Sequence, residues 1–212
     1  MMTKPLLGIF GGTFDPIHRG HLACARYVVE HCALKQLALM PCHLPPHRAT
    51  PGVSSEQRAA MVKLAIANEP TMRLERLELN RTSPSYTVDS LRALKQQQPD
   101  TTLAFIIGMD SLQYFTKWHQ WLQILELAHL IVCRRPGYSA DQGDAPMLLA
   151  RYGATLSQLQ QQDAGKILLL DNPDFYESAT FVRQQLASDR RVQAMLPAEV
   201  LEYIRQHALY GC

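Results

Sequence analysis

The chain has 212 residues, of which 47% are hydrophobic and 19% are charged, and its formal net charge at pH 7 is +2. This composition supports a folded protein with a sizeable core and excludes a largely disordered chain. The small net charge, with no cluster of lysines and arginines, argues against a nucleic-acid partner. No apolar run has the length of a membrane-spanning helix, so no membrane partner is expected.

The five cysteines form no Cys-x-x-Cys pair, and their number is odd. A disulfide framework or a structural metal site is therefore poorly supported, and reduced thiols are the expected state. The first residues carry one lysine and only a short apolar run before Gly11, which does not fit a secretory signal. These features together predict a cytoplasmic protein.

Short apolar runs alternate along the chain with segments of helical periodicity. Most of these runs are apolar throughout, which is typical of strands buried on both faces of a sheet. The predicted strands are Leu6–Phe10, Leu37–Pro41, Met72–Leu79, Leu103–Ile107, Leu130–Cys133 and Ile167–Leu170. The third alternates apolar and charged residues, so we expect it at an edge of the sheet.

Helices are predicted between the strands, the first of them beginning near Arg19. Ser54 and Gln57 form a capping-box pattern that predicts a second helix start, and the last two helices are expected to start near Ser178 and Pro197. Further apolar stripes predict helices around residues 88–94 and 121–128. The alternation predicts an α/β fold with a Rossmann-like, doubly wound, mainly parallel sheet and helices on both faces.

We expect residues 1–212 to form a single domain, with a C-terminal helical portion from about residue 178. Two segments fit no strand. Residues 43–53 carry three prolines and a glycine, and they predict a surface loop. Residues 137–165 are glutamine-rich in part, and they predict a more solvated insertion with one helix.

The stretch GGTFDPIHRGH, residues 11–21, joins the first predicted strand to the first predicted helix. In open parallel sheets, ligands bind beyond the carboxyl ends of the strands, where the strand order reverses. The glycines allow the backbone to approach a phosphate closely, and the helix start presents free N–H groups to an anion. His18 and His21 stand three positions apart, so both can face one ligand, and Thr13 adds a hydroxyl.

The same stretch is also compatible with a plain turn or with a metal site. Gly-Gly followed by Asp-Pro is ordinary turn sequence, and histidines at a helix start are often surface residues. Asp15, His18 and His21 could alternatively hold a metal, although the spacing is not that of H-E-x-x-H and no fourth ligand is evident.

The stretch resembles the signature of the nucleotidyltransferase α/β phosphodiesterase superfamily, and its extended form is most similar to that of bacterial nicotinate-nucleotide adenylyltransferases. Further similarities to this family spread over residues 8–183. They are PPHR at 45–48, SYT at 85–87, FIIGMDS at 105–111, Trp118, CRRPG at 133–137, and SAT at 178–180 with Arg183. The chain departs from the family at two positions. Ala179 stands where the family more commonly has a serine, and Arg48 stands where it has a lysine. An arginine is a rigid fork and a lysine a point charge, so a phosphate contact there would differ in geometry.

The resemblance implies transfer of the adenylyl group of ATP to the 5′-phosphate of nicotinate mononucleotide, giving nicotinate adenine dinucleotide and pyrophosphate. A phosphate monoester is largely a dianion at pH 7, so direct in-line attack needs neither a general base nor a covalent enzyme intermediate. Mg²⁺ is expected with ATP, bridging its phosphate oxygens largely through waters rather than in a dedicated protein site. The expected partners are these two substrates, and the oligomeric state is left open.

The resemblance also implies roles for individual residues. The implied catalytic residues, which would donate to ATP phosphates, are His18, His21 and Arg183. The implied ATP-binding residues are Gly11, Gly12, Thr13, Phe14, Gly108, Asp110, Ser178 and Thr180. The implied nicotinate mononucleotide-binding residues are His47, Arg48, Tyr86, Thr87, Trp118 and Arg134. A carboxylate only accepts hydrogen bonds, so a pocket of N–H donors would favour the acid over the amide.

Several of these residues could equally have a structural role. Ser178 and Thr180 could cap a helix, Asp110 could cap a helix over Ser111–Phe115, and Trp118 could be a core residue. At the level of function, three alternatives remain: a transferase with another acceptor, such as phosphopantetheine, or CTP with an alcohol phosphate; a nucleotide sensor without turnover; and a metal hydrolase.

Overall fold

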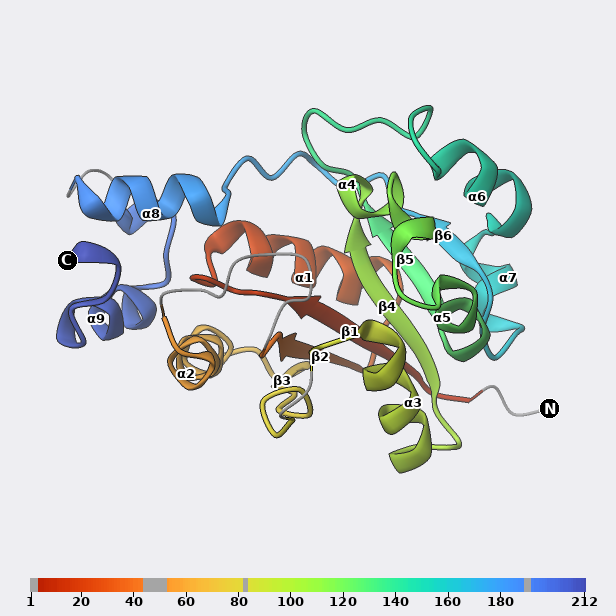
Figure 1. The fold of residues 1–212 in the computed structure, drawn as a ribbon, viewed down its shortest axis with the longest axis horizontal. Helices are drawn as coiled ribbons and strands as arrows, with labels where there is room; N and C mark the ends of the chain where they lie inside the picture. The colour runs from red at the N-terminus through yellow and green to blue at the C-terminus, as the bar shows by residue number, and fades with distance from the viewer. Residues whose placement is uncertain (1–3, 44–52, 82–83, 189–191) are drawn as a thin grey trace.

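Residues 4–43, 53–81, 84–188 and 192–212 are described in the computed structural model of the chain (Figure 1). In these residues six strands pair in parallel into one sheet, with the order β3-β2-β1-β4-β5-β6. The chain thus builds outward from β1 to one edge, crosses back to β4, and builds outward to the other edge. This doubly wound order is that of a Rossmann-like α/β fold and confirms the predicted fold class.

All six predicted strands are present. Their bounds are β1 (Leu6–Gly12), β2 (Gln36–Pro41), β3 (Met72–Leu74), β4 (Thr102–Gly108), β5 (His129–Cys133) and β6 (Ile167–Leu169). β3 lies at an edge of the sheet, as predicted, but its predicted extension to Leu79 was wrong. The N–H of Leu79 donates to the carbonyl of Arg76, so the chain turns there instead of pairing with β2.

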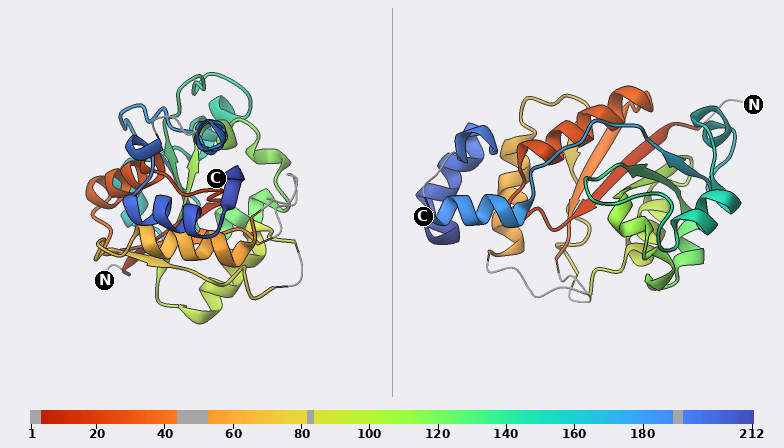
Figure 2. Two further views of the ribbon diagram at one scale, coloured as in Figure 1. Left: turned by 90° about the vertical axis from the view of Figure 1, so that its left-hand side faces the viewer. Right: turned by 90° about the horizontal axis from the view of Figure 1, so that it is seen from above.

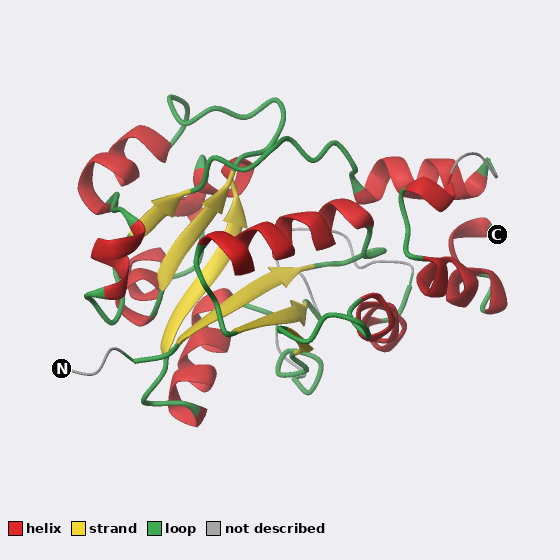
Figure 3. Ribbon diagram, turned by 180° about the vertical axis from the view of Figure 1, so that it is seen from behind, coloured by secondary structure: helices red, strands yellow, loops and turns green. Residues whose placement is uncertain are grey.

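Helices cover both faces of the sheet. Their bounds are α1 (Arg19–His31), α2 (Ser55–Ala65), α3 (Thr87–Gln97), α4 (Met109–Leu112), α5 (Trp121–Leu127), α6 (Ala145–Tyr152), α7 (Leu156–Gln160), α8 (Ala179–Ala187) and α9 (Ala198–Gln206). Figure 3 shows α1 lying across one face, where it shares a core with Leu39 and Ile106. α3, α5 and α6 share the opposite core with Phe105. Adjacent residues of β4 thus point to different cores, as the pleat of a doubly covered strand requires.

The predicted helix starts are confirmed where local capping decides them. Ser54 and Gln57 form the expected reciprocal cap of α2, and Ser178 caps α8. Residues 137–165 differ from the prediction, because they hold two helices, α6 and α7. Leu148 and Leu159 from these helices are fully buried, so the segment contributes to the core despite its glutamines.

α8 and α9 lie at the end of the molecule opposite the N-terminus (Figures 1 and 2), and α9 packs against α2. The segment before α8 passes over the carboxyl ends of the strands and brings the start of α8 to the cavity beside β1. No helix in the described ranges combines the length and the apolar character that crossing a bilayer requires.

Candidate active site

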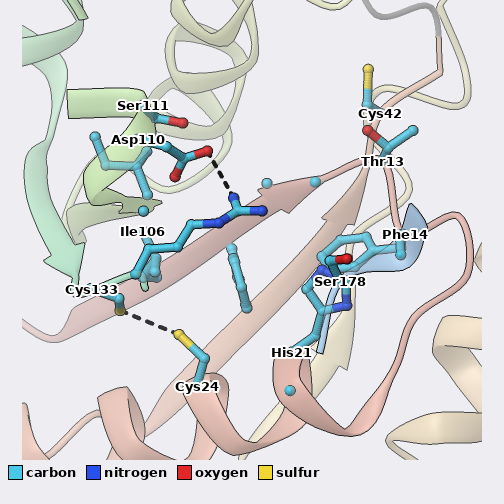
Figure 4. A pocket seen from close by; sticks show the side chains of 18 of the residues that line it. Thr13, Phe14, His21, Cys24, Cys42, Ile106, Asp110, Ser111, Cys133 and Ser178 are labelled. Carbon is cyan, nitrogen blue, oxygen red and sulfur yellow. Dashed lines mark hydrogen bonds and ion pairs between the residues drawn. The ribbon is translucent and has the colours of Figure 1, made fainter. Parts of the chain in front are cut away.

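A cavity of about 650 Å³ opens at the carboxyl ends of β1 and β4, where the strand order reverses (Figure 4). Its wall combines the β1–α1 turn, the end of β4 with α4, the segment after β5, and the start of α8. The predicted site residues that line it are Gly11, Gly12, Thr13, Phe14, His18, His21, Gly108, Asp110, Trp118, Arg134, Ser178, Thr180 and Arg183. The fold therefore brings together residues that lie up to 172 positions apart in the chain (Gly11 to Arg183).

The backbone of the β1–α1 turn is held in place by a buried side chain from α2. Arg58 is 1% exposed, and it donates through Nη1 to the carbonyl of Thr13 and through Nη2 to that of Cys42, the latter at 2.7 Å. Arg58 was not among the residues predicted from the sequence. A signal of its burial is present in the sequence. Met61 and Val62 follow Arg58 three and four positions later, so all three residues lie on the same, apolar face of the helix.

The first glycine of the turn is required by packing. A Cβ at position 11 would lie 2.7 Å from the ring of Phe105, so a larger residue would displace the strand end or the ring. Phe14 then adopts a left-handed backbone (φ 48°), and its ring lies edge-on to that of His21, with centroids 5.1 Å apart. The turn is therefore fixed from both sides before α1 begins.

His18 and His21 cap α1 reciprocally. The N–H of His21 donates to Nδ1 of His18, and the N–H of His18 donates to Nδ1 of His21, each at 3.3 Å. The two rings stack with centroids 3.7 Å apart. Because Nδ1 of each ring accepts a hydrogen bond, each neutral ring carries its proton on Nε2. The capping box thus fixes the tautomer of both imidazoles as Nε2–H donors.

The surroundings keep both imidazoles neutral. Burial, with a smaller contribution from the Arg135 guanidinium, lowers the pKa of His18 to about 4. The pKa of His21 lies well below its usual value of 6.5. Burial is the largest cause, followed by the charges of His18 and then Arg135. Neutral Nε2–H groups in a cavity wall suit donation to an anion, and the lowered pKa values make these histidines weak bases.

The start of α8 meets the β1–α1 turn through Asp15. Arg183 donates through Nη1 to the carbonyl of Asp15 at 2.6 Å, and its Nη2 lies 3.4 Å from Thr180 Oγ1. The Tyr210 hydroxyl donates to Asp15 Oδ1 at 2.7 Å. Ser178 accepts from the N–H of Phe181 at 3.2 Å, so it is a helix cap and a cavity residue at once.

Asp15 therefore faces a cation and a hydroxyl rather than the two histidines. Among the described residues no group of three or more histidine, cysteine or acidic side chains could hold a metal ion. The metal-site alternative for Asp15, His18 and His21 gains no support from this arrangement.

Asp110 and Arg135 form an ion pair at the opposite wall, with 2.7 Å between Oδ2 and Nη1 (Figure 4 shows it as a dashed line at Asp110). Oδ1 of Asp110 is buried, and within the described ranges it has no hydrogen-bond partner. The expectation that Asp110 could cap a following helix was wrong, because α4 begins at Met109 and Gly108 holds the cap position. Arg135 was not among the site residues predicted from the sequence, yet it lines the cavity, and its charge lowers the pKa of both histidines.

The remaining predicted residues are distributed unevenly. Trp118 lines the cavity with its ring edge-on to Phe105, and Arg134 lines it while pairing with Asp171 at 2.7 Å. Tyr86 and Thr87 lie at the start of α3 but outside the described wall, which takes Ser85 from this segment instead. His47 and Arg48 lie outside the described residues.

Glu78 is a further wall residue that was not predicted from the sequence. It is 4% exposed, accepts a hydrogen bond from the Ser90 hydroxyl at 2.7 Å, and burial raises the pKa of its carboxyl. Ser90 belongs to α3, and Arg81 donates to the same hydroxyl at 3.0 Å. This buried network fixes the start of α3 against the cavity. Its only sequence signal was an acidic residue between the apolar Leu77 and Leu79.

Comparison with known proteins identifies relatives along the whole chain. Residues 9–185 match the family model described as cytidylyltransferase-like. A protein of Aeromonas salmonicida, described as a probable nicotinate-nucleotide adenylyltransferase, is 46% identical over 211 residues and 99% of both chains. A protein of Cronobacter sakazakii with the same description is 45% identical, over 95% of this chain and 94% of its own.

Solved structures show the same fold at much lower sequence identity. The nicotinic acid mononucleotide adenylyltransferase of Plasmodium falciparum in complex with NaAD aligns over 97% of both chains, with a TM-score of 0.75 and 18% identity. The same enzyme in complex with APC gives a TM-score of 0.72 at 17% identity and equal coverage.

Proposed function

The chain belongs to the nicotinate-nucleotide adenylyltransferase family, and from this we propose how its cavity performs the reaction. The enzyme transfers the adenylyl group of ATP to the 5′-phosphate of nicotinate mononucleotide, forming nicotinate adenine dinucleotide and pyrophosphate. The observation that carries the proposal is the pair of neutral, reciprocally capped imidazoles beside a glycine-rich strand end. We also propose that the whole chain acts as one catalytic domain in the cytoplasm.

The attacking group is the phosphate of the mononucleotide, which is largely a dianion at pH 7 and needs no base. This agrees with histidines whose lowered pKa values make them weak bases. We assign the Nε2–H groups of His18 and His21 to the phosphate oxygens of ATP, where charge moves toward the leaving pyrophosphate. Donors fixed beforehand in a buried wall stabilise such charge without rearranging at the moment of reaction.

Further donors surround the same phosphates. The backbone at Gly11–Gly12 lines the cavity, and the start of α8 offers the Thr180 hydroxyl and the Arg183 guanidinium. In the first turn of α1, the N–H groups of Arg19 and His21 already donate to the Met195 carbonyl and to His18 Nδ1, so we assign no phosphate contact to them. Arg183 holds the carbonyl of Asp15 in this structure, so its second nitrogen, Nη2, is the one placed nearer to Thr180. We propose that this side binds the β- and γ-phosphates. Catalysis then consists of positioning two anions in line and neutralising charge.

Mg²⁺ enters with ATP as part of the substrate in this proposal. Magnesium seldom needs a dedicated protein cage, so phosphate oxygens and water would hold most of its coordination positions. When bound, the ion supplies charge neutralisation for the phosphates. Oδ1 of Asp110 is buried in the cavity wall with no hydrogen-bond partner among the described residues, so it could accept from a water of such an ion or from a ribose hydroxyl.

The pyridine nucleotide occupies the other end of the cavity in this proposal. Trp118 gives an aromatic wall for the ring, and Arg134 offers a cation whose present partner, Asp171, is an exposed carboxylate. The start of α3 beside Ser85, which includes Tyr86 and Thr87, would provide N–H donors to the nicotinate carboxylate. His47 and Arg48 remain proposed ligands of the mononucleotide phosphate.

The proposed reaction is tested by measuring pyrophosphate release from ATP and Mg²⁺ with nicotinate or nicotinamide mononucleotide as acceptor. We expect strong release with the acid, and weaker release with the amide because its NH₂ would meet N–H donors. Equal release with both would remove the selectivity assigned to the start of α3. Release with neither, while ATP still binds, would overturn the proposed function.

A further inference from the structure

Two cysteines face each other in the wall of the cavity. The sulfur atoms of Cys24 and Cys133 lie 3.3 Å apart and share a hydrogen bond (Figure 4). Cys24 belongs to α1 and Cys133 is the last residue of β5, so the contact joins segments 109 positions apart. The proposed transfer of the adenylyl group uses neither thiol.

Both cysteines line the cavity, so a small oxidant that enters the cavity reaches them. Cys133 is 3% exposed, whereas Cys24 is partly exposed, which makes Cys24 the more accessible sulfur. The hydrogen bond with Cys133 lowers the pKa of Cys24, and the same contact together with burial raises the pKa of Cys133. The accessible sulfur is therefore the one favoured as thiolate, which is the reactive form.

The other cysteines lack this combination. Burial raises the pKa of Cys32 and of Cys42 to about 11, and the sulfur of Cys42 faces Glu78 rather than a second thiol. Cys212 is exposed near the end of the chain. A lowered thiol pKa at Cys24, access through a cavity and an adjacent second thiol coincide at Cys24 and Cys133.

We propose that Cys24 and Cys133 form an oxidation site, a dithiol that hydrogen peroxide converts to a disulfide and so slows the enzyme. The Cys24 thiolate attacks one peroxide oxygen, the O–O bond breaks, and the departing hydroxide takes a proton to leave as water. The sulfenic acid formed on Cys24 is then attacked by the Cys133 sulfur, the S–O bond breaks, and a second water leaves. Two thiols lose two electrons in total, and one peroxide gains them.

The consequence for catalysis follows from the neighbours of the two cysteines. Cys24 lies one helical turn after His21, and Cys133 precedes Arg134 and Arg135. A disulfide holds its sulfur atoms about 2.0 Å apart, so the 3.3 Å contact must shorten by roughly 1 Å. That movement shifts the start of α1 relative to the end of β5, and a misplacement of about 1 Å can cost about a hundredfold in rate. This step rests on the proposed function.

The test combines peptide mapping with activity. The purified full-length protein is treated with hydrogen peroxide, with and without ATP and Mg²⁺, and the cysteine-containing peptides are mapped by mass spectrometry without reduction. We expect a linked peptide joining Cys24 to Cys133, less of it when ATP fills the cavity, and at least about a tenfold loss of pyrophosphate release that dithiothreitol reverses.

Four single variants make the assignment specific, and each is compared with its own rate before peroxide treatment. Cys24→Ser and Cys133→Ala should form no linked peptide and lose the dithiothreitol-reversible part of the inhibition. Cys212→Ser and Cys42→Ser should keep both, because neither cysteine belongs to the pair.

The outcomes separate this inference from the proposed function, because the linked peptide is detected whether or not the protein has adenylyl-transfer activity. Absence of the linked peptide, or its formation without any change in rate in an active enzyme, overturns the inference. An unchanged peroxide response in Cys24→Ser does so as well. The linked peptide together with reversible inhibition that both pair variants abolish supports it.

Discussion

The helices α1 and α8 both begin at the cavity, and they are held there in different ways. α1 starts with His18 and His21, whose side chains cap each other's backbone and whose rings stack, so its cap is formed by residues three positions apart. α8 starts with a single Ser178 cap, and it reaches the turn through Asp15, which lies 168 positions before Arg183. The cap of the first helix start is therefore local, although the Arg19 N–H also donates to the Met195 carbonyl at 2.8 Å, whereas the second helix start meets the turn through a tertiary contact.

The two helix starts therefore suit different roles in the reaction. On the α1 side His18 is buried, His21 is partly buried and both are neutral, so the direction of these donors is set before substrate binds. On the α8 side Arg183 is partly exposed and lies 3.7 Å from Asp15 Oδ2, so we expect this ion pair to be weak and Arg183 to turn toward an incoming anion. We therefore expect the α1 side to affect turnover most, and the α8 side to affect ATP binding most. Three substitutions and a pH series test this comparison, from the largest expected effect to the smallest.

Replacing His21 with alanine should lower turnover by about a hundred- to a thousandfold, the usual cost of losing one fixed donor to a reacting anion. Loss of the reciprocal cap should lower the free energy of unfolding by only about 1 kcal/mol. Steady-state kinetics and urea unfolding measure the two quantities. A folded variant with full activity, or a variant that does not fold, would contradict the phosphate role.

Replacing Arg183 with alanine should weaken ATP use by about ten- to a hundredfold, mostly as a higher KM for ATP, because a charge-assisted contact is lost. The KM for nicotinate mononucleotide should change little. Arg183→Lys keeps the charge and tests whether the two-nitrogen guanidinium is needed. Gln184→Ala, one position along α8, is the control. An equal loss for both substrates would remove the distinction between the two helix starts.

Acid should destabilise the α1 side before substrate binds. The folded pKa of His18 is about 4 against 6.5 unfolded, so between these values the unfolded chain binds more protons. The free energy of unfolding should therefore fall as pH drops from 6.5 toward 4, by up to about 1.4 kcal/mol per pH unit for one histidine. Urea unfolding of the substrate-free protein between pH 7 and 4, compared with His18→Asn, measures this slope. An identical slope in the variant would mean that His18 is not the group responsible.

Replacing Tyr210 with phenylalanine should have the smallest effect. The hydroxyl donates to Asp15, and its loss should cost about 1 kcal/mol, or roughly a fivefold rise in the KM for ATP if Asp15 then moves Arg183. Turnover at saturating ATP should remain within about twofold. A large fall in turnover instead would show that Asp15 controls the histidines as well.

How far the sequence predicted the site depends on how local each contact is. The helix start near Arg19 and the placement of His18 and His21 beside the glycines could be predicted because these residues lie in one stretch of eleven, whereas the reciprocal cap between the two histidines was not predicted. The cap formed by Ser54 and Gln57 could be predicted from its own local sequence. Residues such as Ser178 and Arg183 were placed by family resemblance, since their own segment shows only a helix start.

Other members of the wall could not be found from local pattern. Arg58 is a charged residue on a helix, and only the fold shows that its guanidinium is buried and bonded to two carbonyls. Arg134 and Arg135 are adjacent in the sequence, and only the folded structure shows that Arg135 pairs with Asp110. Glu78 and the Cys24–Cys133 contact likewise join segments that the sequence does not relate.

The sequence by itself determined the strands, most helix starts and the glycine–histidine turn, because apolar periodicity and capping act between residues a few positions apart. Only the tertiary structure decided which strand ends meet at the cavity, which charges pair across it, and which thiols touch. Those contacts depend on the order of strands in the sheet and on the burial it produces, and burial is also what lowers the pKa of His18 and His21.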